Sequence, residues 1–190
     1  MKRLFIALLS LVFTLNTASA QRTVRVNLEE MVSAAGMIVH GTVIFVKTEI
    51  DPQTSILSTF VTIDVTENLY GQPEGVVTIK MVAAQTQSGA RKFAEMPTFT
   101  PGEEIVGFFH LPSKLGFTSP VGMGQGKFSV VIDPATKQKI VRNGMNNARL
   151  FSGVNHASAL AKTEWTKNSN EPITVSDLTA TIRSFVTIVK

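Results

Sequence analysis

The glycine-rich run at residues 122–128, GMGQGKF, is the segment whose composition is closest to that of a ligand-binding motif. A phosphate-binding loop also places a lysine after glycines. It further requires a serine or threonine after that lysine and a helix whose N-terminus faces the phosphate. Here Phe128 follows the lysine, and the next residues alternate as in a strand. We therefore predict a tight turn or bulge before a strand, and no bound cofactor.

The three histidines give little support for metal chemistry. His40, His110 and His156 are isolated, without the HxH, HxxxH or HExxH spacing of common metal sites. His40 and His110 fall in apolar runs that predict strands, although a fold that brought them together could still form a metal site. The sequence contains no cysteine, which excludes thiol catalysis, thiolate zinc sites and iron–sulfur clusters. We predict no metal.

Hydrolytic chemistry is also weakly supported. A Ser-His-Asp triad is defined by geometry rather than by spacing, but no GxSxG elbow points to one. The acidic pairs Glu29-Glu30 and Glu103-Glu104 are predicted on a helix surface and in a turn, where solvation is their ordinary explanation. We predict that the protein is not an enzyme. A hydrolase or metal-assisted enzyme that uses the isolated histidines is the alternative.

The first twenty residues have the pattern of a cleavable secretory signal. Lys2 and Arg3 precede the almost purely apolar residues 4–15, and an Ala-Ser-Ala pattern ends at Ala20. The apolar stretch is shorter than the roughly 20 residues that a bilayer-spanning helix needs, and Gln21 begins a polar run. We expect cleavage between Ala20 and Gln21, giving an exported protein, periplasmic or extracellular, without a membrane anchor.

The charge of the mature chain favours neither nucleic acid nor an anionic membrane. The full sequence has 18 basic and 14 acidic residues, a net charge of +4. Without the two basic residues of the predicted signal, 16 basic residues face 14 acidic ones, and no dense basic block concentrates the excess. We expect a protein partner of unknown identity and no nucleic-acid partner.

Helical periodicity occurs only near the two ends of the mature chain. Asn27 is the expected N-cap of a short first helix, and Ser176 that of a C-terminal helix. The apolar faces of these helices are predicted to consist of Val26, Leu28, Met31 and Val32, and of Leu178, Ile182, Phe185, Val186 and Val189.

Between the helices the chain has the shorter rhythm of strands. Residues 58–69 alternate, with Val61 and Ile63 on one face and Thr62 on the other, which predicts a strand half buried on a core. The predicted strands cover residues 37–50, 55–69, 76–82, 105–111, 127–132 and 139–141. The first three are expected to form a meander, and residues 105–111 to be buried on both faces. The set predicts a small antiparallel barrel, with a sandwich as the alternative.

Two segments lack this periodicity. Residues 83–100 are long for a loop inside a compact domain and combine apolar with basic side chains, which is typical of a contact surface. The candidate partner contacts are Arg91, Lys92, Phe93, Met96 and Phe99. Alternatively, Phe93 and Phe99 plug one end of the barrel. We expect a signal at residues 1–20, a barrel at 21–141, a loose connector at 142–175 and a helix at 176–190.

Several runs resemble a family of uncharacterised bacterial exported proteins. Residues 58–71, STFVTIDVTENLYG, are similar to that family's "YTxVTLxVxEVLKG" strand, and the family also has a leucine-patterned C-terminal helix. A weaker similarity links the chain to netrin-like, OB-type barrels, including tissue inhibitors of metalloproteinases, and implies a five-stranded barrel core. Those inhibitors chelate zinc through an N-terminal cysteine, which this chain lacks. The other runs that carry the resemblance are residues 38–43, 99–104 and 124–128.

Taken together, these patterns predict an exported, non-catalytic β-barrel module that binds another protein in the periplasm or outside the cell. Besides the enzyme, the remaining alternative is a carrier that holds a small ligand in the mouth of the barrel.

Overall fold

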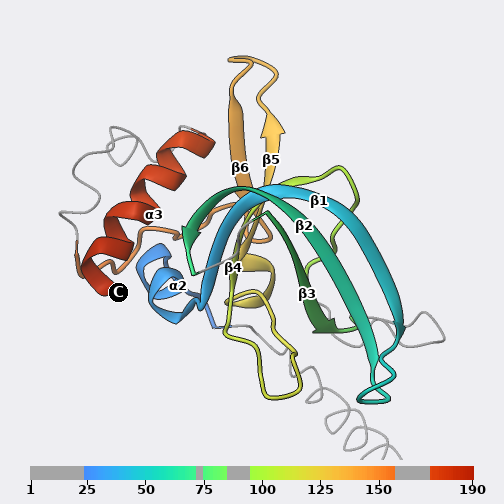
Figure 1. Ribbon diagram of the computed structural model, residues 1–190. Helices are drawn as coiled ribbons and strands as arrows, with labels where there is room; N and C mark the ends of the chain where they lie inside the picture. Colours follow the sequence, from blue (N-terminus) through green and yellow to red (C-terminus); the bar gives the residue numbers. More distant parts are fainter. Residues whose placement is uncertain (1–23, 72–74, 85–94, 157–171) are drawn as a thin grey trace, which may run out of the picture.

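The computed structural model describes residues 24–71, 75–84, 95–156 and 172–190 (Figure 1). The predicted cleavage site at Ala20 and Gln21 lies outside these residues. Within them, neither α-helix is long and apolar enough to cross a membrane. The elements are α2 (Leu28–Ala34), β1 (Met37–Ile50), β2 (Leu57–Tyr70), β3 (Val76–Val82), β4 (Glu104–Phe109), the 3-10 helix η1 (Met123–Gln125), β5 (Lys127–Ile132), β6 (Lys139–Asn143) and α3 (Val175–Val189).

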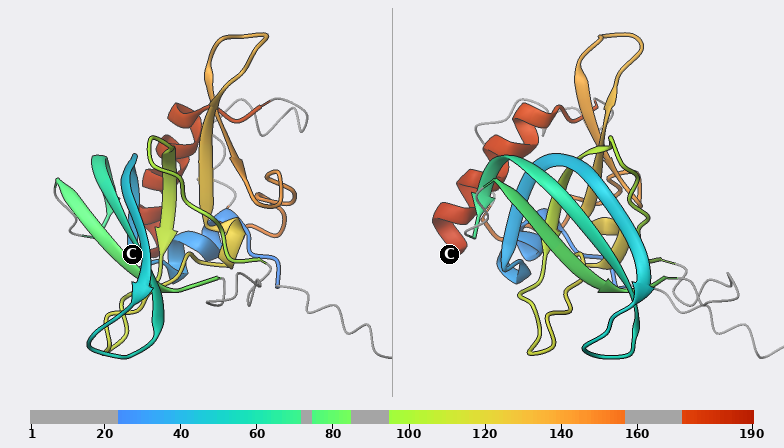
Figure 2. Two further views of the ribbon diagram at one scale, coloured as in Figure 1. Left: turned by 90° about the vertical axis from the view of Figure 1, so that its right-hand side faces the viewer. Right: turned by 45° about the vertical axis from the view of Figure 1, so that its right-hand side comes forward.

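The six strands form one antiparallel sheet in the order β3-β2-β1-β4-β5-β6. β1, β2 and β3 are consecutive neighbours, so the predicted meander is confirmed, as is the mainly β fold with a helix at each end. β1 and β2 bend into an arch, and the β5–β6 hairpin projects away from the body (Figures 1 and 2). Because β3 and β6 are separate edges, the sheet itself does not close.

Residues 117–121 bring the barrel part of the way to closure. On one side, the backbone N–H of Thr118 donates to the carbonyl of Lys80 in β3 at 2.8 Å. On the other side, the N–H of Val121 donates to the carbonyl of Phe108 in β4 at 2.9 Å. These contacts are isolated bridges and not a strand, so the barrel of β1 to β4 is a loose one.

The sheet separates two apolar cores, and β4 contributes to both. Phe109 packs inside the arch, whereas Phe108 packs on the opposite face against the helices. Both are fully buried, which confirms burial on both faces of this strand, although Leu111 beyond its end is 75% exposed. The inner core also includes Val39, Val43, Val61, Ile63, Ile79, Met81, Phe99 and Ile105. The outer core includes Leu28, Met31, Val32, Phe128, Leu150, Leu178, Ile182 and Phe185.

The ends of both helices are fixed by side chains. The Asn27 side chain accepts from the N–H of Glu30 at 2.9 Å, and the Glu30 carboxylate accepts from the N–H of Asn27 at 2.8 Å. This capping box confirms Asn27 as the first N-cap. The prediction of Ser176 as the second is wrong, because the Thr174 hydroxyl accepts from the N–H of Asp177 at 3.1 Å and Ser176 already lies within α3. Two hydroxyl residues this close together cannot be ranked by pattern alone.

The first part of the predicted connector is packed and not loose. Residues 144–153 form a series of turns, and Leu150 is only 2% exposed in the outer core. The Asn27 side chain donates to the carbonyls of Ser152 and Gly153, and the Asn147 side chain donates to the carbonyl of Val141 at 2.7 Å. These asparagine side chains therefore supply hydrogen bonds to backbone carbonyls of the turns and of β6. Residues 157–171 lie outside the described part of the chain.

Candidate functional site

A pocket of about 930 Å³ lies at the base of the β5–β6 hairpin. Its walls come from residues 95–98, the glycine-rich turn, β5 and the end of β6. This volume falls in the roughly 300–1,000 Å³ range of small-molecule sites. The lining residues are Arg25, Glu95, Met96, Pro97, Thr98, Gly122, Gly124, Gln125, Lys127, Ser129, Arg142, Asn143, Gly144 and Met145.

The glycine-rich turn builds one wall of this pocket, and its backbone amides are bonded within the protein. Gly122 and Met123 both have positive φ, at 63° and 58°, and η1 leads directly into β5. The backbone N–H groups of residues 123–126 all donate to carbonyls of the protein. The predicted tight turn before a strand is confirmed. Because these four donors are already used, the turn does not form the amide cradle of a phosphate loop.

Gln125 holds the N-terminal arm against the turn and so places Arg25 at the pocket. Its side-chain oxygen accepts from the N–H of Val26 at 3.1 Å, and its amide nitrogen donates to the carbonyl of Val24 at 3.0 Å. The Gln125 residue is only 5% exposed. The backbone on both sides of Arg25 is therefore fixed by one buried side chain, while the Arg25 side chain itself is exposed.

The buried ammonium of Lys127 joins the wall formed by residues 95–98 to β5. The Lys127 ammonium donates to the Glu103 carboxylate and, at 2.8 Å, to the carbonyl of Thr98. It also lies over the Phe99 ring, 5.1 Å from the centroid. The Ser129 hydroxyl donates to the same Glu103 carboxylate at 2.6 Å. Both polar side chains that β5 turns toward the pocket are thus paired with Glu103, and they fix the segment that follows residue 95.

Two of the five predicted contact residues are described, and both are buried: Met96 lines the pocket, and Phe99 packs in the inner core. Met96 is 7% exposed, and Phe99 is 8% exposed. The Phe99 ring packs in the inner core with its centroid 6.5 Å from that of Phe109, which is the position that the plug interpretation requires. The other three, Arg91, Lys92 and Phe93, lie outside the described residues, so the contact role of the set stays a prediction.

Sequence reasoning missed the pocket residues outside residues 83–100. Arg25 and Arg142 are ordinary surface arginines by pattern, and the hydrogen bonds of Gln125 span about a hundred residues. The glycine-rich run was the one available signal, because turns that bring backbone segments close together also shape pockets.

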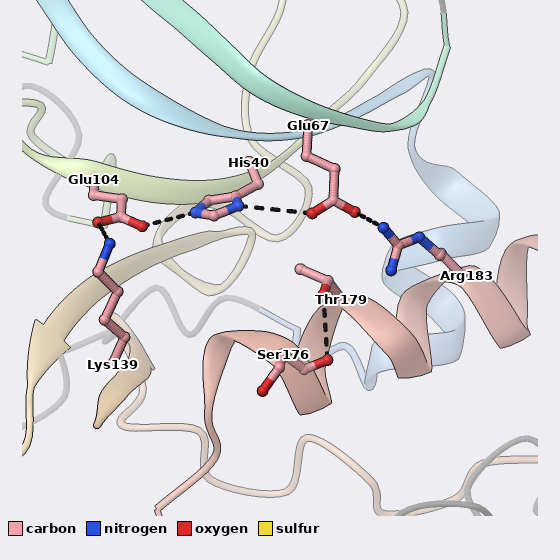
Figure 3. Close-up of polar contacts among 7 residues, drawn as sticks. All are labelled: His40, Glu67, Glu104, Lys139, Ser176, Thr179 and Arg183. Atoms are coloured by element: carbon pink, nitrogen blue, oxygen red, sulfur yellow. Dashed lines mark hydrogen bonds and ion pairs between the residues drawn. The ribbon is translucent and has the colours of Figure 1, made fainter. Parts of the chain in front are cut away.

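A second polar cluster lies between the sheet and α3, centred on His40 (Figure 3). His40 Nε2 is 2.9 Å from the Glu104 carboxylate in β4, and Nδ1 is 3.8 Å from the Glu67 carboxylate in β2. Lys139 of β6 pairs with Glu104 at 2.7 Å, and Arg183 of α3 pairs with Glu67. This chain of polar contacts therefore draws on four strands, β6, β4, β1 and β2, and ends on α3.

The groups in this cluster already have partners. Burial acts to raise the pKa of Glu104, but hydrogen bonds and charge from Lys139 and His40 outweigh it and hold that pKa below its ordinary value. On α3, the Thr179 hydroxyl donates to the carbonyl of Ser176 at 3.2 Å and is not aimed at the imidazole (Figure 3). We interpret the cluster as a structural link between the sheet and α3.

The lowered pKa of Glu104 predicts a pH-dependent contribution to stability. A carboxylate with a depressed folded pKa stabilises the fold above its unfolded pKa, and this contribution disappears as pH falls through the folded value. We expect the wild type to exceed Glu104→Gln by about 1.5 kcal/mol in free energy of unfolding near pH 6. The difference should shrink as pH falls below the ordinary glutamate value of 4.5. Urea unfolding across this range measures it.

Asp64→Asn is the matched control for this pH series. The Asp64 side chain is exposed on β2 and has no ion pair among the described residues, so its substitution should change stability little. A wild-type advantage over Glu104→Gln that stays constant down to about pH 3 would contradict the assignment.

The remaining histidines lie in other surroundings. His110 is exposed just beyond β4, and the His156 ring lies 2.6 Å from the Glu29 carboxylate of α2. That carboxylate also accepts from the N–H groups of Asn155 and His156. In the described part of the chain, no three His, Asp or Glu side chains are grouped so that they could hold a metal ion.

Comparison with known proteins gave no match to any family model, curated protein or solved structure. The resemblance of the strand and helix runs to exported β proteins and to netrin-like barrels therefore stays a prediction.

Proposed function

We propose that the mature chain is an exported, non-catalytic binding module and that the pocket at the base of the β5–β6 hairpin holds part of a partner protein. The pocket is the observation that carries this proposal. It is concave, its walls are fixed, and it joins apolar lining side chains such as Met96 and Pro97 to a few polar ones. Such a combination is typical of a recognition site.

The bonding within the pocket supports binding over catalysis. Of the polar side chains that line the pocket, the Lys127 ammonium and the Ser129 hydroxyl both donate to the same oxygen of the Glu103 carboxylate. A base that activates a nucleophile must be free to take its proton, whereas this carboxylate oxygen is already shared with the Lys127 ammonium. In this arrangement the three groups instead position residues 95–100.

The surroundings of the pocket favour a protein partner. The β5–β6 hairpin, whose base lines the pocket, projects from the body (Figure 2). Val131 and Ile132 on this hairpin are 41% and 56% exposed, and Met145 at the pocket is 41% exposed. Exposed apolar side chains beside a concave site are common where a larger partner covers both. The pocket volume alone would also suit a small-ligand carrier, which is the second candidate.

Filling the pocket tests this proposal. Thr98 lines the pocket with an exposed side chain, and only its backbone carbonyl holds Lys127. Thr98→Trp should therefore fill the space while the fold is kept. Thr66→Trp, at an exposed position of β2 outside the pocket, is the matched control. Each mature variant would be used as bait in the periplasmic and secreted fractions of the producing cell, followed by mass spectrometry.

The expected result is a protein that is retained by the wild type and by Thr66→Trp but is reduced at least tenfold with Thr98→Trp. Equal capture by the two tryptophan variants would show that the pocket is not the contact site. Capture of no protein, with a small molecule retained by the wild type and lost in Thr98→Trp, would favour the carrier.

A further inference from the structure

The rim of the pocket carries two arginines that have no acidic partner in the part of the chain that the structure describes. Arg25 and Arg142 both line the pocket with exposed side chains, and neither guanidinium makes an ion pair or hydrogen bond with the described residues. Among the described lining residues, Glu95 is the acidic one, and the charge of Lys127 is balanced by Glu103. Two guanidinium groups that are unpaired among the described residues therefore line a concave site together with one carboxylate.

Both arginines stand on fixed backbone, which limits the entropy lost when they bind. Gln125 bonds the backbone on either side of Arg25. Arg142 lies in β6, paired with Ser129 of β5, directly before Asn143, whose side chain donates to the carbonyl of Gln125 at 3.1 Å. Guanidinium groups on rigid supports suit bidentate recognition of planar anions.

The other walls indicate which anion fits. The backbone N–H groups of residues 123–126 are already used within the protein, so the turn does not supply the amide donors of typical phosphate sites. The lining also offers apolar surface from Met96, Pro97 and Met145. We infer that the pocket binds a carboxylate carried on an apolar chain, held by Arg25 and Arg142. This inference rests on the proposed function, because it assigns the ligand chemistry of the same pocket.

The test uses charged probes, each with a neutral counterpart, added to the mature chain and followed by NMR titration. Hexanoate is compared with hexanamide for a small acid. The peptide Leu-Asp-Leu-Asp-Leu, blocked at both ends, is compared with its asparagine form for a polypeptide. We expect each charged probe to bind at least about tenfold more tightly than its neutral counterpart. We expect the charged peptide to bind more tightly than hexanoate, as a protein partner requires; tighter binding of hexanoate would favour the carrier.

Charge-removing variants complete the test. Arg25→Gln and Arg142→Gln should each weaken binding of the charged probes about tenfold or more, since a charge-assisted hydrogen bond is lost. Arg149→Gln removes the same charge from an exposed position outside the pocket and should bind as the wild type does. Thermal unfolding of each variant checks that the fold is kept, as expected for exposed side chains.

Two outcomes would overturn the inference: charged probes that bind no better than the neutral ones, or unchanged binding in both pocket-arginine variants. The proposed function would survive either result if Thr98→Trp still reduced partner capture. It would fail separately if capture were insensitive to Thr98→Trp.

Discussion

Ile63→Asp is expected to prevent the protein from folding. Ile63 is fully buried in the inner core, on the face of β2 that points into the arch, and Val61 occupies the equivalent position two residues earlier. A carboxylate there would lose its hydration without gaining a partner, at a cost of several kcal/mol, approaching the ~5–15 kcal/mol that stabilises a typical domain. Val61→Asp should have the same effect.

Thr62→Asp is the control for these substitutions, because it adds the same charge one residue away on the opposite face. The Thr62 hydroxyl lies 3.0 Å from that of Thr78 on the solvent side of the sheet. We expect a loss of about 1 kcal/mol or less. Soluble yield and circular dichroism of the three variants measure the result. A folded Ile63→Asp protein, or an unfolded Thr62→Asp protein, would mean that the faces of β2 are assigned wrongly.

Phe99→Ala is expected to lower the free energy of unfolding by about 3 kcal/mol or more, the usual cost of truncating a buried aromatic residue. The Phe99 ring packs against the inner core near Phe109, and the Lys127 ammonium lies over it. Its removal therefore leaves a cavity and deprives a buried cation of one contact. Urea unfolding at constant pH measures the change.

Phe45→Ala is the control, since it makes the same substitution at a phenylalanine that is 53% exposed on β1. Its cost should be about 1 kcal/mol at most. If Phe99 instead served only as a contact for a partner, Phe99→Ala would leave stability nearly unchanged and would abolish partner capture.

Local patterns determine much of the fold. The alternation around Val61 and Ile63 identified a half-buried strand, because apolar residues at every second position indicate a strand with one face on the core. The polar residue Asn27 before an apolar helical run identified the first cap, since its capping partner Glu30 lies only three residues away. Features of this kind depend on neighbours in sequence, and the structure confirms them.

Features that depend on distant residues could not be predicted in the same way. The incomplete closure of the barrel depends on where residues 117–121 meet Lys80 and Phe108, contacts for which the sequence has no periodic signal. The packing of Leu150 likewise depends on α2, more than a hundred residues earlier in the chain. The pocket could not be predicted for the same reason, because it is built from segments that are far apart in the sequence: the N-terminal arm, the glycine-rich turn and β6.

The central claim is that a partner protein is bound at the pocket, and site-specific photocrosslinking in the producing cell tests it most directly. A photoreactive phenylalanine analogue would replace Thr98 at the pocket or Thr66 on the exposed part of β2. We predict one discrete crosslinked partner from position 98 and none from position 66. A partner crosslinked equally from both positions, or from position 66 alone, would contradict the claim.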